Sequence, residues 1–102
     1  MASIGSGVIP IAGANNVRLT NLSLPTPNAE VSFSLISGLK AIEIKNRDPF
    51  EVKFSFVIGD SGTTYFTIPK YAAYSKDNIT FTGKTIYLQS VGASTLEILE
   101  YY

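Results

Sequence analysis

The sequence contains neither cysteine nor histidine among its 102 residues. Without cysteine, the chain has no disulfide framework and no thiolate for catalysis or metal binding. Without histidine, it lacks the commonest metal ligand and the only side chain whose unperturbed pKa lies near neutrality. Carboxylates, lysines, tyrosines and hydroxyls are the groups left for chemistry. The sequence therefore predicts a protein that is not an enzyme and that holds no metal or cofactor.

The chain also lacks net charge, because its 8 basic and 8 acidic residues cancel. A balanced chain produces no long-range field that would gather phosphates or anionic lipids. No window approaches the ~20 apolar residues that a membrane-spanning helix needs. The short apolar cluster near the N-terminus has no basic start and is interrupted by Pro10, so it does not match a secretory signal. We expect neither nucleic acid nor a membrane as a partner.

The clearest pattern in the sequence lies within residues 50–69. Apolar side chains occupy every second position of residues 50–58, and strand side chains alternate between two faces with this period. Residues 59–62 supply turn chemistry. The β-branched and aromatic run of residues 63–68 then ends at Pro69. This stretch predicts a β-hairpin with one buried face.

The rest of the chain contains further short alternating segments separated by turn residues. Residues 18–24 suit a short edge strand, residues 70–78 predict a polar crossover over one end of the sheets, and no segment has a convincing helical period. About seven to nine short strands, with turn signals at roughly eight- to twelve-residue spacing, predict an all-β fold. We expect an antiparallel β-sandwich of jelly-roll type over residues 18–102. Its predicted core side chains are Val31, Phe33, Leu35, Ile42, Ile44, Val52, Phe54, Phe56, Phe66, Ile68, Phe81, Ile86, Leu88, Leu96 and Ile98.

Residues 1–17 contain no charged side chain and mix Gly, Ala and Ser with aliphatic side chains. Disordered tails are usually charged and poor in aliphatics, so we expect an extended N-terminal arm. The sequence leaves open whether the arm packs on its own domain, packs on a neighbouring subunit or stays free. Its candidate interface residues are Ile4, Val8, Ile9 and Ile11.

Apolar and aromatic side chains are also expected on the outward faces of several strands. One interpretation is purely structural: cross-strand pairing of Tyr and Thr on a solvated sheet face. A second interpretation is a protein contact surface, since tyrosine is enriched at interface cores. The candidate contact residues are Tyr65, Tyr87, Leu99, Tyr101 and Tyr102. A third interpretation is stacking on a glycan, for which the candidates are Tyr65, Tyr71, Tyr74 and Tyr87.

The remaining polar groups offer little for catalysis or metal binding. Glu97 and Glu100 lie three residues apart on an expected strand, so they face opposite sides and cannot act as a paired acid and base. Residues 60–62 and 77–78 could offer oxygens to calcium. A calcium site needs about six to eight ligands, and these residue types are the usual ones in turns.

Three segments carry a resemblance to a known group of proteins. They are residues 61–69 (SGTTYFTIP), residues 85–90 (TIYLQS) and residues 96–101 (LEILEY). In these segments the sequence resembles small all-β virion structural proteins of tailed bacteriophages. The resemblance extends over about residues 40–102 and rests on turns and strands, with no catalytic residue to carry over.

The resemblance implies a capsid decoration protein, or a head-completion or tail accessory protein. Such a protein would be made in the bacterial host cytoplasm and located in the virion. Its partners would be other copies of itself and the major capsid or tail proteins. The alternative function is a carbohydrate-binding β-sandwich module that uses the surface tyrosines.

Overall fold

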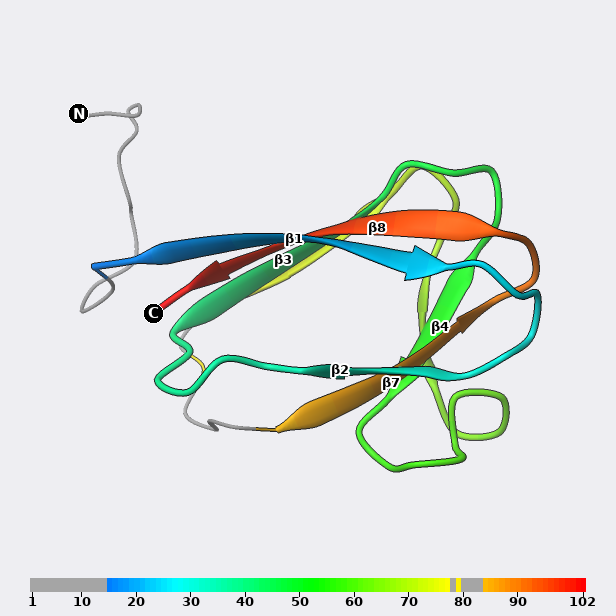
Figure 1. Cartoon of the computed structure of the whole chain (residues 1–102), viewed down its shortest axis with the longest axis horizontal. Coiled ribbons are helices and arrows are strands. Elements are labelled where there is room, and N and C mark those ends of the chain that lie inside the picture. The colour runs from blue at the N-terminus through cyan, green and yellow to red at the C-terminus, as the bar shows by residue number, and fades with distance from the viewer. Residues whose placement is uncertain (1–14, 78, 80–83) are drawn as a thin grey trace.

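The computed structural model describes residues 15–77, 79 and 84–102. These residues form eight β-strands and no helix, so the described ranges contain no helix that could cross a membrane. The strands lie in two layers that face each other (Figure 1). In chain order they are β1 (Val17–Leu24), β2 (Val31–Ser34), β3 (Ala41–Asn46), β4 (Val52–Ser55), β5 (Phe66–Ile68), β6 (Ala73–Lys76), β7 (Thr85–Ser90) and β8 (Ser94–Tyr101).

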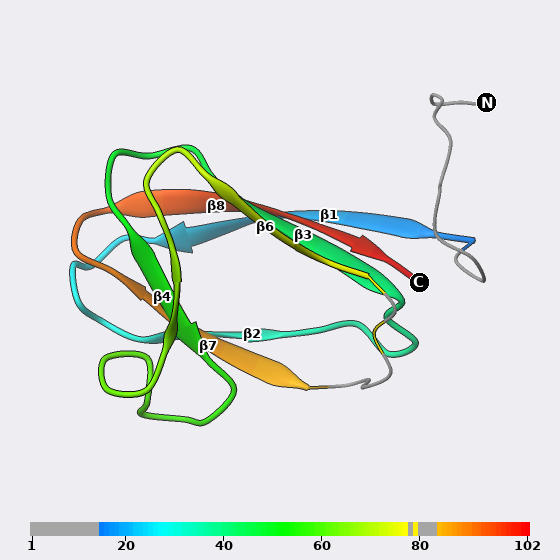
Figure 2. The ribbon, with the colours of Figure 1, turned by 180° about the vertical axis from the view of Figure 1, so that it is seen from behind.

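The strand order identifies the architecture. Sheet one has the order β1-β8-β3-β6 and sheet two has the order β2-β7-β4-β5, and all pairs are antiparallel. The chain passes between the sheets at every connection of the described strands except the one from β4 to β5. Figure 2 shows β6 beside β3 in one layer and β4 in the other. This arrangement is an eight-stranded jelly roll, and the predicted all-β sandwich is confirmed.

The core lies between the two sheets, on the inward positions of the alternating strands. Val31 and Phe33 are half-buried and pack against it, whereas Phe81 lies outside the described residues. Leu24, Leu39 and Ile79 are buried although they were not predicted there. The predicted core residues that are buried are Leu35, Ile42, Ile44, Val52, Phe54, Ile68, Ile86, Leu88, Leu96 and Ile98.

The predicted core position of Phe56 and Phe66 is wrong. Phe56 is 51% exposed and Phe66 is 56% exposed. The strand predicted over residues 50–58 covers only Val52–Ser55, so Phe56 belongs to a long loop that leaves the sheet. Phe66 lies on the three-residue edge strand β5. Its ring reaches the open side of the sandwich, where its centroid is 5.3 Å from that of Tyr74.

Three further expectations require correction. Phe50 and Ile58, at the two ends of the predicted strand, are exposed. The observed strand β4 is shorter than predicted and includes neither residue. The strand expected over residues 63–68 begins only at Phe66, since residues 61–64 form turns. The polar crossover expected over residues 70–78 contains β6, which pairs with β3 and forms an edge of sheet one. Its inward residue Tyr74 packs on Phe54 with centroids 5.3 Å apart, and this contact supplies the burial that the polar sequence does not suggest.

Two buried polar residues join elements that are distant in the sequence. Glu100 is fully buried on β8. One of its carboxylate oxygens accepts from Arg18 at 2.7 Å and the other accepts from the backbone N–H of Ile36 at 2.8 Å. Asn46 donates from its amide nitrogen to the carbonyl oxygens of Phe50 and Pro69, at 2.7 and 3.1 Å. Among the described residues, no buried side-chain nitrogen or oxygen lacks a hydrogen-bond partner.

Candidate interaction surface

The outer face of sheet one carries four apolar or aromatic residues on two neighbouring strands. Val17 and Leu19 lie on β1, and the ladder places them beside Tyr101 and Leu99 of β8. Val17 is 44% exposed and Leu19 is 65% exposed, while Leu99 and Tyr101 are half-buried. We call these four residues the outer strip. Leu99 and Tyr101 face outward as predicted, whereas the sequence analysis did not select Val17 or Leu19.

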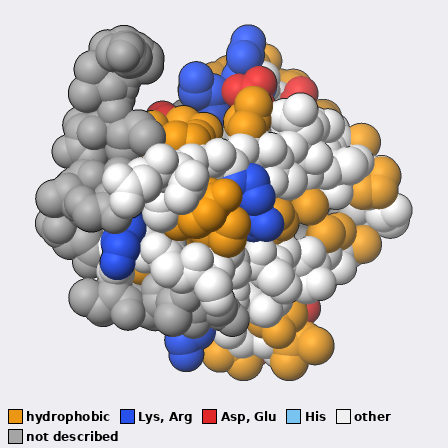
Figure 3. Space-filling model, turned by 60° about the vertical axis from the view of Figure 1, so that its left-hand side comes forward, with side chains coloured by type: hydrophobic (Ala, Val, Ile, Leu, Met, Phe, Trp, Pro, Cys, Tyr) orange, Lys and Arg blue, Asp and Glu red, His pale blue; other side chains and the backbone are white. Residues whose placement is uncertain are grey.

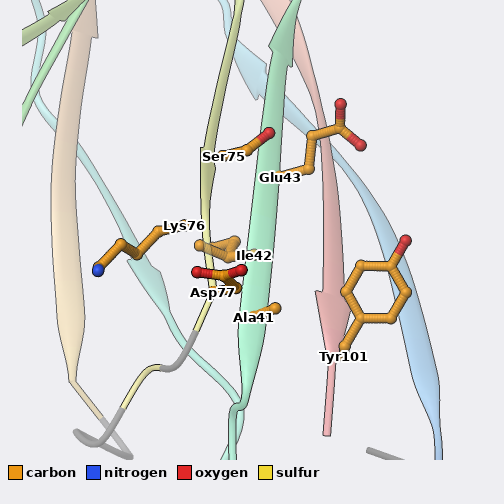
Figure 4. A pocket seen from close by; sticks show the side chains of 7 residues that line it. All are labelled: Ala41, Ile42, Glu43, Ser75, Lys76, Asp77 and Tyr101. Carbon is orange, nitrogen blue, oxygen red and sulfur yellow. The ribbon is translucent and has the colours of Figure 1, made fainter. Parts of the chain in front are cut away.

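Two hollows lie beside the outer strip. One, of about 80 Å³, is lined by Leu19, Leu99 and the charged side chains of Glu43, Lys45 and Glu97. The larger, of about 380 Å³, opens next to Tyr101 and reaches β6. In Figure 4 the side chains of Glu43, Ser75 and Tyr101 project to one side of sheet one, while Lys76 extends to the other. The outer strip is therefore an apolar ridge with two hollows beside it whose linings include charged side chains.

The two ends of the described chain meet at the outer strip. The backbone N–H groups of Asn15 and Asn16 donate to the carbonyl oxygen of Tyr102, at 3.0 and 2.8 Å, and the N–H of Tyr102 donates to Asn16 at 2.9 Å. These bonds extend the β1–β8 ladder to the last residue, so residues 15 and 16 belong to the sandwich and not to a separate arm. Ile4, Val8, Ile9 and Ile11 lie outside the described residues. Asn15, the residue that follows residues 1–14 in the sequence, lies at this end of the ladder.

The other predicted contact tyrosines lie elsewhere. Tyr87 is on the outward side of β7 in sheet two. Tyr65 is exposed in the loop before β5, and the ammonium group of Lys53 lies 4.7 Å from the centroid of its ring. Tyr74 faces the core from sheet one, and Tyr71 lies in the β5–β6 turn with a φ of 58°. The structure thus places Leu99 and Tyr101 on one face, with Tyr102 next to them in the backbone ladder, but does not bring all four glycan candidates onto one face.

A second exposed apolar region lies in the loop between β4 and β5. Phe56, Val57 and Ile58 are consecutive, and Ile58 is 73% exposed. The carboxylate of Glu30 fixes this loop by accepting from the N–H of Gly59 at 2.8 Å and from the N–H and hydroxyl of Ser61. The Ser61 hydroxyl and then the Gly59 N–H lower the pKa of Glu30 below its ordinary value, against an opposing effect of burial. Sequence reasoning missed Glu30 because its partners lie about thirty residues away.

The surface offers no concentrated chemical centre in the part of the chain that the structure describes. No group of three or more Asp, Glu, His or Cys side chains there could hold a metal ion. Glu97 faces outward, 3.3 Å from Arg47, and Glu100 faces the core, so the prediction that these two carboxylates do not pair is confirmed. In Figure 3, hydrophobic side chains on one side of the molecule form separate patches among polar atoms.

Comparison with known proteins supports the architecture. No protein-family model and no curated protein matches the sequence. Among solved structures, the chain is similar to a de novo designed double-stranded β-helix, with a TM-score of 0.54 and 19% sequence identity over 83% of this chain and 99% of that chain. It also aligns with PirA, with a TM-score of 0.38 and 10% identity over 85% of each chain. The chain is a small jelly-roll protein of the double-stranded β-helix type.

Proposed function

We propose that this protein is a non-enzymatic structural component of the virion of a tailed bacteriophage. In this role it acts as a capsid decoration protein, or as a related head or tail accessory protein. It contacts other copies of itself and the capsid or tail proteins. The observation that carries this proposal is the outer strip, an apolar ridge on a small jelly roll at the point where an uncharged N-terminal segment joins. The resemblance of residues 61–69, 85–90 and 96–101 to phage virion proteins supports the same role.

The physical argument concerns the cost of leaving the outer strip in water. Complete burial of a leucine side chain such as Leu19 is favourable by about 1.5–3 kcal/mol. An interface that covers the ridge gains this burial free energy at each copy, and the charged side chains of the hollows toward β3 can form part of its rim. A decoration protein needs many such modest contacts repeated by symmetry. The ridge therefore suits repeated binding to a particle better than recognition of a small molecule.

The experiment that tests this proposal is the composition of purified phage particles. Particles from the host that carries this gene are purified by density gradient and analysed by quantitative mass spectrometry. We expect the protein to be present in fixed proportion to the major capsid protein. Purified protein added back to particles from a strain with the gene deleted should bind until a fixed copy number is reached. Absence from the particles, together with failure to bind in the add-back assay, would refute the proposal.

Two variants and one titration sharpen this test. Leu99→Ser should weaken binding to the deleted particles, whereas Val57→Ser, which changes an equally apolar residue on the loop before β5, should not. Removal of residues 1–14 should also weaken binding without lowering Tm. Titration of tyrosine fluorescence with saccharides should give no change. A saturable change without particle binding would instead favour the carbohydrate-binding alternative.

A further inference from the structure

The edge strand β1 differs from the three other edges of the two sheets. The edges β2, β5 and β6 contain 4, 3 and 4 residues, whereas β1 contains 8. Natural sheets protect their edges by keeping them short or by placing charges and prolines there. β1 has no proline, and its one charged residue, Arg18, faces inward to Glu100. This edge is long and carries no outward charge.

The hydrogen-bond pattern shows which backbone groups of β1 point to the open edge. Asn16 and Tyr102 exchange both of their N–H···O bonds, so they form a hydrogen-bonded pair of the antiparallel ladder. Such pairs alternate with pairs that are not hydrogen-bonded. By the register of β1 and β8, the residues whose N–H and C=O groups point away from β8 are Val17, Leu19, Asn21 and Ser23. The structure gives these backbone groups no hydrogen-bond partner among the described residues.

We propose that β1 pairs antiparallel with β1 of a second copy of this chain and forms a two-fold symmetric dimer. Full overlap of the two strands places Thr20 on the two-fold axis. It pairs Val17 with Ser23 of the second copy and Leu19 with Asn21 of the second copy. Sheet one of the first copy and sheet one of the second copy then form one continuous sheet. Every N–H and C=O group at the open edge of β1 gains a hydrogen-bond partner.

The side chains of β1 are compatible with this register on both faces. On the outer face, the two Leu19 side chains take diagonal positions across the axis, at the distance where long side chains still touch. On the inner face, the two Thr20 side chains lie directly opposite, and each Arg18 faces Leu22 of the second copy. No like charges meet. Because the same surface is used on both copies, the contact closes as a dimer and does not continue into a fibre.

The test is the solution mass of the full chain, measured by sedimentation and light scattering over a concentration series. We expect the mass to rise from 11.0 kDa to twice that value. Leu19→Lys should remain monomeric because it places a charge at the edge, and Leu19→Pro because it removes an N–H that the dimer needs but β8 does not use. The matched control is Ser75→Lys on the edge strand β6, which should still dimerise.

The absence of native cysteine allows a second measurement that reports the register. Thr20→Cys should form an intermolecular disulfide under mild oxidation, because two residues facing each other at a non-hydrogen-bonded pair have the Cα separation that a disulfide requires. Asn21→Cys should not, because its counterpart is Leu19. A chain that stays monomeric at all concentrations, or a dimer unaffected by Leu19→Lys and Leu19→Pro, would overturn the inference. A failure of this inference can be told apart from a failure of particle binding, since a monomer can still bind capsid or tail proteins.

Discussion

Glu100→Ala should be among the most destabilising single substitutions in the sandwich. Its carboxylate links β8 to Arg18 of β1 and to the backbone N–H of Ile36 after β2, so three elements depend on it. The guanidinium of Arg18 also donates to the carbonyl oxygen of Ser34 at 3.2 Å and lies 5.4 Å from the ring centroid of Phe33. The carboxylate thus holds the two sheets together at the end where Asn16 and Tyr102 pair.

The expected magnitude follows from what the substitution leaves behind. Removing one partner of a buried ion pair costs about 3–5 kcal/mol, but the Arg18 side chain is 37% exposed and can partly return to water. The N–H of Ile36 loses its acceptor, which costs about 1–3 kcal/mol if the group stays buried. Together, these two effects should lower the free energy of unfolding of Glu100→Ala by about 3–4 kcal/mol. In a domain of this size that corresponds to a fall in Tm of roughly 12–30 °C.

The assay is chemical denaturation of the wild type, Glu100→Ala, Arg18→Ala and the double variant. The loss of stability in the double variant should be well below the sum of the losses in Glu100→Ala and Arg18→Ala, because each single substitution removes the same contact. Glu100→Gln should cost less than Glu100→Ala, since its amide oxygen can still accept from Ile36. The control is Glu97→Ala, whose exposed contact with Arg47 should be worth no more than about 1 kcal/mol. A Glu100→Ala loss below 1 kcal/mol, or full additivity with Arg18→Ala, would refute this account of the buried pair.

Three further predictions concern the core, a turn and a loop. Phe54→Ala should destabilise the fold by about 3–5 kcal/mol in denaturation, because its ring is buried against those of Phe66 and Tyr74; a shift in Tm of only a degree or two would remove Phe54 from the core. Asn46→Asp should lower the free energy of unfolding more than Asn46→Ala at neutral pH, because it places an acceptor where the amide nitrogen now donates to carbonyl oxygens. Lowering the pH should narrow the difference between the two variants in denaturation, and equal losses at every pH would contradict this. Glu30 has a lowered pKa in the folded chain, so the stability it contributes is present above its unfolded value near 4.5 and is lost as pH falls through the folded pKa. The protection factor of the Gly59 amide against exchange should therefore fall in the wild type as pH falls through this range, and a protection factor that does not change with pH and equals that of Glu30→Gln would contradict this.

Local alternation in the sequence was sufficient to predict the strands but not their ends. Val52 and Phe54 are buried as their spacing predicts, and the same period wrongly extends the strand to Phe56. A period of two reports which side a residue faces while the strand lasts. It does not report where the chain leaves the sheet. The loop beyond that point is held by the contacts of Glu30 with Gly59 and Ser61, which are long-range in sequence.

The outer strip was predictable in part, because alternation along a strand shows which of its side chains face outward. Leu99 and Tyr101 could be placed outward because they follow the alternation of their own strand. Val17 and Leu19 share that signal, but only the register of β1 with β8 shows that they lie beside Tyr101 and Leu99. The burial of Glu100 likewise follows from parity, but its partners in β1 and after β2 follow only from tertiary packing.

The antiparallel pairing of β1 with β8 determines how the domain responds to force. Residue 15 and the C-terminal Tyr102 leave the ladder at the same end. Tension applied between these two points pulls across the strands, along the direction of their hydrogen bonds. The bonds then break one after another from Tyr102 inward, as in a zipper, and do not resist together as they would in shear. Mechanical load applied between these two points would therefore open this domain at low force.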